Sequence, residues 1–157
     1  MPIKIPDSLP ATSILESENI FVMTEHRAMH QDIRPLNVLI FNLMPTKVVT
    51  ENQLLRKLSN TPIQVHVEFL QTSSYTPTHV DQEHLESFYT TFDQIKDRWF
   101  DGMIITGAPL GEVEYEDVSY WDELTTIMEC LKHTYTAPYI FVGEHWRDFT
   151  IIFIFRR

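Results

Sequence analysis

Cysteine is nearly absent from this sequence, because only Cys130 among the 157 residues is one. An intrachain disulfide is therefore excluded, and cysteine usage does not mark a secreted chain. The N-terminus has no long apolar run after Lys4 and does not have the pattern of a signal peptide. We expect a cytoplasmic protein.

Positive charge and long apolar runs are also scarce. The 12 Lys and Arg residues face 22 Asp and Glu residues, which gives a formal net charge of −10. This balance argues against a nucleic-acid partner, although a local basic cluster could still hold an anionic, nucleotide-bearing ligand. The longest apolar run near the C-terminus, residues 151–155, is far shorter than the ~20 residues that a membrane helix needs, so no membrane partner is expected.

The stretch from Arg34 to Leu70 gives the clearest structural pattern. A continuous apolar run at 36–43 predicts a strand buried on both faces, and alternation at 63–70 predicts a strand nearer a sheet edge. Between these strands the apolar residues recur at helical spacing, which predicts a helix. Its inward side is expected to hold Val49, Leu54, Leu55 and Leu58. A strand, crossover helix and strand in this order predict parallel pairing with a right-handed connection.

Further elements repeat this alternation. The amphipathic stretch 83–99 predicts one helix, residues 103–106 predict a short strand, and residues 120–133 predict another helix. The inward side chains of this last helix are expected to be Trp121, Leu124, Ile127, Met128 and Leu131. Alternating strands and helices indicate an α/β fold with a parallel sheet.

The first 35 residues are richer in proline and predict an N-terminal arm. It holds a short helix at 12–19 and a short strand at 21–23, and it must pack on another surface, such as a second subunit of a homodimer. His26 and His30 are four residues apart, but no third ligand is evident nearby, so we expect no metal site.

Two features are candidates for a catalytic role, the loop at 107–111 and Cys130. The glycine-flanked loop at 107–111 follows a predicted parallel strand, where open α/β sheets place ligands and where backbone N–H groups can face an oxyanion. An ordinary strand-to-helix turn explains this loop equally well. Cys130 lies inside a predicted helix rather than on an exposed turn beside a base, so we do not expect it to be a nucleophile.

A dense, collinear set of motifs runs through residues 1 to about 133. It consists of residues 27–28, 31–36, 42–45, 47, 50–56, 60–62, 83–85, 88–89, 92–93, 100–102, 106–111 and 120–121. These motifs closely resemble those of a known family, the bacterial homoserine O-acyltransferases of methionine biosynthesis.

The resemblance implies a class I glutamine amidotransferase-like, flavodoxin-like fold, of which this chain holds the N-terminal part. It also implies transfer of an acyl group from acyl-CoA to L-homoserine, with no further cofactor. In the family a cysteine on a strand-to-helix turn becomes an acyl-thioester, and a histidine oriented by a glutamate activates it. Thiolate suits this task because it is both a good nucleophile and a good leaving group.

Three positions of this chain match functional positions of the family. Leu110 matches a backbone donor of the oxyanion hole. Gly111 matches the position that sorts acyl donors, where glycine goes with succinyl-CoA and glutamate with acetyl-CoA. Lys47 matches a lysine near the site, and a substrate contact and a salt link are equally open roles for it.

After His133 the resemblance fails. Val142 stands where the family has its cysteine, and the family histidine and glutamate have no counterpart. A shift of the reading frame can restore the family pattern. If the third codon base of each residue from Ile140 onward is joined to the first two bases of the next codon, the new codons can encode Ile-Cys-Trp-Gly-Ala-Leu-Ala-Gly-Leu-Tyr, the family's nucleophile turn. We therefore favour a frameshift, in the gene or its sequencing, over natural divergence or a genuine alternative tail.

These observations divide the chain into the arm at 1–35, the N-terminal portion of an acyltransferase domain at 36–142, and a non-native-looking tail at 143–157. The first hypothesis is a homoserine O-succinyltransferase that is inactive as written. The alternatives are a homoserine O-acetyltransferase of the same family, a non-catalytic α/β binding module, and an amidotransferase-type hydrolase. Ordered packing of residues 134–157 would favour the binding module, whereas a tail translated from a foreign reading frame should show no such fit.

Overall fold

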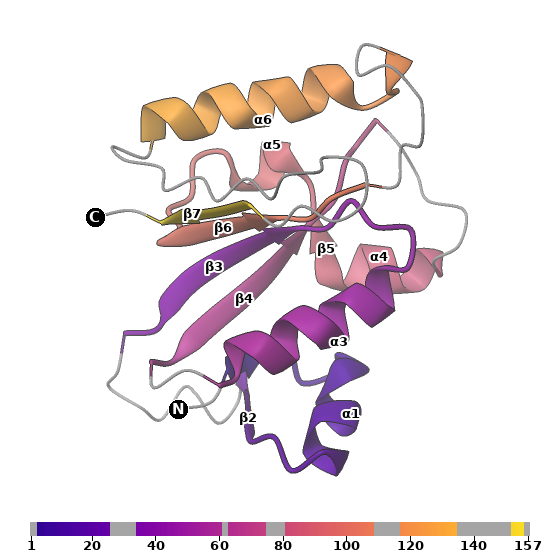
Figure 1. Ribbon diagram of the computed structural model, residues 1–157, viewed down its shortest axis with the longest axis vertical. Helices are drawn as coiled ribbons and strands as arrows, with labels where there is room; N and C mark the ends of the chain where they lie inside the picture. Colours follow the sequence, from indigo (N-terminus) through magenta and orange to yellow (C-terminus); the bar gives the residue numbers. More distant parts are fainter. Residues whose placement is uncertain are drawn as a thin grey trace.

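The computed structural model describes residues 3–25, 34–60, 63–74, 81–108, 117–134 and 152–155 of the chain. These residues form one mixed sheet of seven strands with helices on both faces (Figure 1). The elements in chain order are β1 (Ile3–Ile5), α1 (Ala11–Ser17), β2 (Val22–Thr24), β3 (Leu36–Phe41), α3 (Lys47–Leu58), β4 (Val65–Leu70), α4 (Gln82–Phe88), β5 (Tyr89–Thr90), α5 (Phe92–Ile95), β6 (Gly102–Ile105), α6 (Trp121–Thr134) and β7 (Ile152–Phe155).

The sheet has the strand order β2-β1-β4-β3-β6-β7, and β5 pairs with the far end of β4. Every pairing is parallel except that of β7 with β6. The strand, helix and strand predicted between residues 34 and 70 are present as β3, α3 and β4. The predicted α/β class with a parallel sheet and flanking helices is confirmed.

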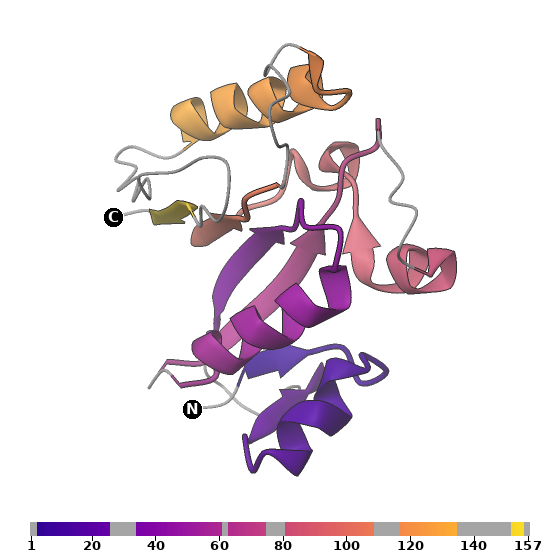
Figure 2. The same cartoon turned by 45° about the vertical axis from the view of Figure 1, so that its right-hand side comes forward.

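Strand β3 lies in the middle of the sheet and sends alternate side chains to two separate cores. Val38 and Ile40 belong to the core under α1 and α3, whereas Leu39 and Phe41 belong to the core under α5 and α6. Figures 1 and 2 show α6 on one side of the sheet and α3 on the other. Because both faces are covered, an uninterrupted apolar run is the pattern that this strand needs.

The prediction that residues 63–70 lie nearer an edge is wrong. Strand β4 pairs with β3 along its whole length, with β1 near its start, and with β5 at its end. The polar residues of its alternating pattern have partners: His66 contacts the side chain of Asn37, and Glu68 binds Arg98. Alternation therefore arose here from paired polar side chains rather than from solvent on one face.

The N-terminal arm packs against its own chain. Strand β1 pairs with both β2 and β4, and Ile3, Ile5 and Leu15 are fully buried in the core under α1 and α3. An ion pair between Glu18 and Arg56 links the end of α1 to α3. The predicted strand and helix are confirmed, with the helix ending at Ser17, and the domain boundary at residue 35 stays a prediction.

The single helix predicted over 83–99 is wrong, because the chain breaks it at Tyr89. This residue is extended, with φ −111° and ψ 142°, and pairs with Phe69 as part of β5. A new helix, α5, then begins after Thr91, whose N–H donates to the side chain of Gln94. Tyr89 and Thr90 favour strands, and pairing with β4 overrides the helical spacing. Trp99, the last residue of this amphipathic stretch, is 51% exposed.

The inward face of α3 is also different from the prediction at its first turn. Leu54 and Leu55 are buried and Leu58 packs against the same core, as expected. Val49, however, is 55% exposed, and the buried residues of the first turn are instead polar: Lys47, Thr50 and Glu51. These three lie at helical spacing with Leu54, so the helix is rotated to bury charge next to its leucines.

Helix α6 confirms the prediction for residues 120–133. Leu124 and Ile127 are buried in the core under α5 and α6, and Trp121 and Met128 pack against it; the side chain of Leu131 lies outside the described residues. Among the helices that the structure describes, none is long and apolar enough to span a membrane.

Strand β7 is the described part of the predicted tail. It runs antiparallel to β6, with Gly102 opposite Phe155 and Ile105 opposite Ile152. The apolar run of the tail thus pairs with β6, and this pairing was not predicted from the sequence. His26, His30 and residues 135–151 lie outside the described residues.

Leu55→Ala tests the assignment of the buried side of α3. Because Leu55 is fully buried, we expect the free energy of unfolding to fall by about 2–5 kcal/mol. Val49→Ala on the same helix should change it by about 0.5 kcal/mol or less, since that side chain is mostly in solvent. Urea unfolding of the two variants measures both values, and a larger loss for Val49→Ala would contradict the observed face.

Candidate functional site

The loops that leave β3 and β6 lie side by side at the carboxyl edge of the sheet. Phe41 and Ile105, the last residues of these strands, are paired in register. Beyond them the Leu43 N–H donates to Thr106 Oγ1 at 2.7 Å, and the Thr106 N–H donates to the Phe41 carbonyl at 3.0 Å. This edge is where parallel sheets hold ligands, so the tied loops mark the candidate site.

Of the residues predicted for the site, the structure describes only Lys47. Leu110, Gly111 and Val142 lie outside the described residues, so the predicted oxyanion donor, donor-specificity position and vacant nucleophile position remain predictions. Gly107 and Ala108, the first part of the glycine-flanked loop, follow β6 directly without regular structure. The loop thus begins beside the turn that follows β3.

Lys47 opens α3, and its side chain is folded back into the protein. Its Nζ donates to the backbone carbonyl of Asn42 and lies 5.0 Å from the centre of the Tyr89 ring. Only 5% of the residue is exposed. The ammonium group therefore lies between the turn after β3 and the ring of Tyr89, and both roles considered for Lys47, a substrate contact and a salt link, stay predictions.

Glu51 lies one turn further along α3 and is 1% exposed. Its carboxylate accepts a hydrogen bond of 2.6 Å from the Tyr89 hydroxyl, and His84 Nε2 lies 3.1 Å from the same oxygen. A buried carboxylate is tolerated only when it is paired and hydrogen-bonded, and here both conditions are met. Helices α3 and α4 and strand β5 therefore meet at one charged group.

The electrostatics of this cluster follow from burial. Burial lowers the pKa of Lys47 to about 8, and the negative charge of Glu51 only partly opposes this shift. Burial raises the pKa of Tyr89, as do the charge and the hydrogen bond of Glu51. The tyrosine consequently stays a neutral donor across the physiological pH range, while the lysine changes charge at mildly alkaline pH.

A second polar contact ties the other side of the edge. The Glu123 carboxylate, in the first turn of α6, accepts hydrogen bonds from the N–H and hydroxyl groups of both Ser73 and Ser74, which follow β4. Burial alone would raise the pKa of Glu123, but these hydrogen bonds lower it below its ordinary value. The loop after β4 is thus linked to the start of α6.

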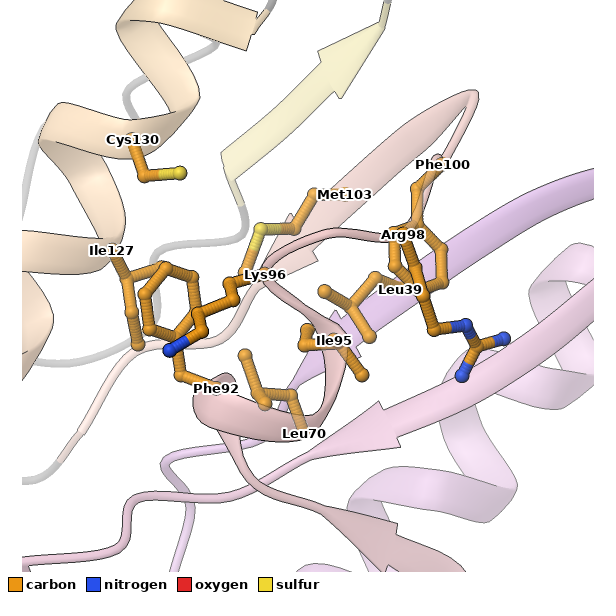
Figure 3. A pocket seen from close by; sticks show the side chains of 10 residues that line it. All are labelled: Leu39, Leu70, Phe92, Ile95, Lys96, Arg98, Phe100, Met103, Ile127 and Cys130. Atoms are coloured by element: carbon orange, nitrogen blue, oxygen red, sulfur yellow. The ribbon is translucent and has the colours of Figure 1, made fainter.

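Cys130 does not reach the edge. It lies on α6 and lines a mostly apolar cavity of about 40 Å³ between α5, α6 and the sheet (Figure 3). Most of the side chains around the cavity are apolar, among them Ile127, Met103 and Leu39, but Lys96 and Arg98 also border it. Cys130 lies within a helix, as predicted, and the expectation that it is not a nucleophile stays a prediction.

The sequence did not predict that four polar residues would contact one another: Asn42, Glu51, His84 and Tyr89. Glu51 is 33 residues from His84 and 38 residues from Tyr89 in the sequence, and it meets them only because α4 and β5 pack beside α3. One signal was available: Lys47, Thr50 and Glu51 share a helical side with Leu54, and charge on an apolar side indicates a buried polar cluster. Among the described residues, no group of three His, Cys, Asp or Glu side chains could hold a metal ion.

Replacing Lys47 by methionine tests its buried charge through the pH dependence of stability. Between its folded pKa of about 8 and its ordinary value of 10.5, the unfolded chain keeps a proton that the folded chain has released. The free energy of unfolding should therefore gain up to about 1.4 kcal/mol per pH unit from this residue as the pH rises through that range.

The measurement is urea unfolding at several values from pH 7 to 10, with Lys47→Met compared to the parent chain. The difference in unfolding free energy should move in favour of the parent as the pH rises. Lys57→Met, which removes an exposed lysine from the same helix, is the control. A pH-independent difference for Lys47→Met would show that Lys47 titrates as an ordinary surface lysine.

Most of this chain is similar in sequence to known proteins. The family profile described as homoserine O-succinyltransferase matches residues 2–142. A homoserine O-acetyltransferase of Bacillus licheniformis is 62% identical over 137 residues, which cover 87% of this chain and 45% of that protein. A homoserine O-acetyltransferase of Acetivibrio thermocellus is 59% identical over 133 residues, covering 85% of this chain and 44% of that protein.

A homoserine O-succinyltransferase of Vibrio campbellii is 58% identical over 137 residues, covering 87% of this chain and 44% of that protein. The chain thus spans less than half the length of these curated relatives. Both acyl groups occur among their names, so overall identity does not separate them. The match over residues 2–142 nevertheless covers the whole described sheet up to β6 together with α6, and this chain belongs to the homoserine O-succinyltransferase family.

Proposed function

We propose that this chain is the N-terminal portion of an enzyme that transfers succinyl from succinyl-CoA to L-homoserine. The family match over residues 2–142 carries the proposal, because it includes both loops that meet at the carboxyl edge of the sheet. In the reaction, a cysteine thiolate attacks the thioester carbonyl of the acyl-CoA and releases CoA. The homoserine hydroxyl then attacks the enzyme thioester, and its proton passes to a base.

The choice of succinyl over acetyl rests on Gly111. A glutamate carboxylate at this position would occupy space and repel the free carboxylate of a succinyl group, whereas glycine leaves room for it. The competing acetyl assignment draws support from relatives named homoserine O-acetyltransferase at 59% and 62% identity. One residue in the acyl pocket can outweigh such overall identity, because it changes the charge that the donor meets.

We further propose that the chain as written does not perform the transfer. Val142 has no nucleophilic atom, and the sole cysteine of the sequence, Cys130, lines an apolar cavity away from the strand-end loops. A non-catalytic α/β module is the alternative, and the antiparallel pairing of β7 with β6 supports it. Such pairing is also within reach of any β-prone segment beside an open strand edge, so it does not by itself require a selected tail.

The purified chain should release no CoA from succinyl-CoA in the presence of homoserine, because it has no thiol at position 142. Free CoA is measured with a thiol reagent, and a full-length homoserine O-acyltransferase provides the positive control. Turnover above the rate in buffer would contradict the proposal. Sequencing the gene across codons 133–142 decides separately between a frameshift and a genuine tail.

With the reading frame restored, the full-length protein should have a higher kcat/KM for succinyl-CoA than for acetyl-CoA. Gly111→Glu should shift the ratio of the two values toward acetyl by at least about tenfold, equivalent to about 1.4 kcal/mol. Glutamine is nearly the same size as glutamate but carries no charge. Gly111→Gln therefore separates steric exclusion of the succinyl group from repulsion of its carboxylate. A restored protein that prefers acetyl-CoA would refute the succinyl assignment.

A further inference from the structure

Three buried polar side chains, together with the partly buried His84, form a continuous path of hydrogen bonds from α4 to the turn after β3. His84 Nε2 lies 3.1 Å from Glu51 Oε1, and the Tyr89 hydroxyl donates to the same oxygen at 2.6 Å. Asn42 Nδ2 donates to the Tyr89 hydroxyl at 2.9 Å. The path ends where the Met44 N–H donates to Asn42 Oδ1 at 3.2 Å.

The Tyr89 hydroxyl sets the direction of this path. Its single proton goes to the Glu51 carboxylate, so its oxygen is left to accept from Asn42. Asn42 must therefore turn its amide nitrogen toward Tyr89 and its amide oxygen toward the Met44 N–H, because a flipped amide would place two donors against each other at Met44. Asn42 is fully buried, so no bulk water can replace a lost partner.

Asn42 in turn contacts Lys47 at both ends of the lysine. Its backbone carbonyl accepts from Lys47 Nζ, and its Nδ2 lies 3.3 Å from the Lys47 backbone carbonyl. The Tyr89 ring lies under the ammonium group at 5.0 Å. The side chain of Asn42 thus joins the two ends of residues 42–47, and its backbone carbonyl holds the lysine ammonium group.

We propose that Tyr89, Glu51 and His84 are positioning residues, which act through Asn42 to hold the Lys47 ammonium group and the 42–46 turn at the carboxyl edge of the sheet. The relevance of that edge to acyl transfer rests on the proposed function. The hydrogen-bond path itself does not. A core of apolar residues would fill the same volume at lower cost, so buried charge at this place indicates a demand for one defined geometry.

The lowered pKa of Lys47 is consistent with this arrangement, because burial removes the hydration that stabilises the charged ammonium group. The charged or titratable groups in the cluster are Lys47 and Glu51 of α3, His84 of α4 and Tyr89 of β5. Each bridges two elements, so a change at one is transmitted to the next through a hydrogen bond rather than through solvent.

Tyr89→Phe is the decisive variant, since it removes the hydroxyl and keeps the ring beneath Lys47. By NMR of the 157-residue chain, the Met44 amide should exchange with solvent at least about tenfold faster, and the Lys47 Cε and Nζ signals should shift. The Leu43 amide, which donates to Thr106 rather than to Asn42, is the internal reference and should change less.

Two further variants separate positioning from general stability. Ile127→Ala lies in the core on the opposite face of the sheet and should lower the free energy of unfolding without a selective effect at Met44 or Lys47. His84→Gln retains a donor that can reach Glu51 and should preserve both signals, whereas His84→Leu should not. His66→Gln, at a histidine outside the path, is the matched control for substitution itself.

The proposal is overturned if Met44 exchange and the Lys47 signals in Tyr89→Phe change only as they do in Ile127→Ala at an equal loss of stability. It is equally overturned if His84→Leu leaves both unchanged. These measurements need no acyl donor, so their failure would leave the acyl-transfer proposal intact. Conversely, a frame-restored protein without acyltransferase activity would refute the proposed function and leave the hydrogen-bond path in place.

Discussion

The parallel pairing of β3 with β4 on one side and β6 on the other is the constraint on which the described structure depends. It brings the carboxyl ends of three strands to one edge and divides the apolar side chains of β3 between two cores. Helices α1 and α3 can cover one face, and α5 and α6 the other, only because β3 is apolar on both sides (Figure 2). The loops at the edge then inherit their proximity from strand register rather than from contacts of their own.

Charge is buried where this edge meets α3. Burying the Glu51 carboxylate and the Lys47 ammonium group is unfavourable unless each finds partners, and the protein supplies them from α4, β5 and the turn after β3. The same partners explain why the chain leaves the helix at Phe88: an extended Tyr89 pairs with Phe69 and directs its hydroxyl to Glu51. A continuous helix through Trp99 would have forfeited both contacts.

The two faces of the sheet differ in what they offer chemically. The cavity between α5 and α6 is small and mostly apolar, and Cys130 borders it together with Lys96 and Arg98. The opposite face carries the polar path that ends at the strand-end turn. Membership of the homoserine O-succinyltransferase family directs attention to this edge, where the loop beginning at Gly107 leaves β6. On the far side of β6, the antiparallel β7 occupies the strand edge.

The sequence by itself determined the α/β class, the β3–α3–β4 unit, the helix after residue 120 and the family, because these depend on local periodicity and on collinear motifs. It also singled out Lys47, but not what Lys47 contacts. Only tertiary structure decided that β4 lies inside the sheet, that Val49 faces solvent, and that Glu51, His84, Tyr89 and Asn42 meet. The reason is physical. A hydrophobic pattern indicates which side of one helix or strand is buried, whereas strand order and polar pairing depend on which distant elements become neighbours.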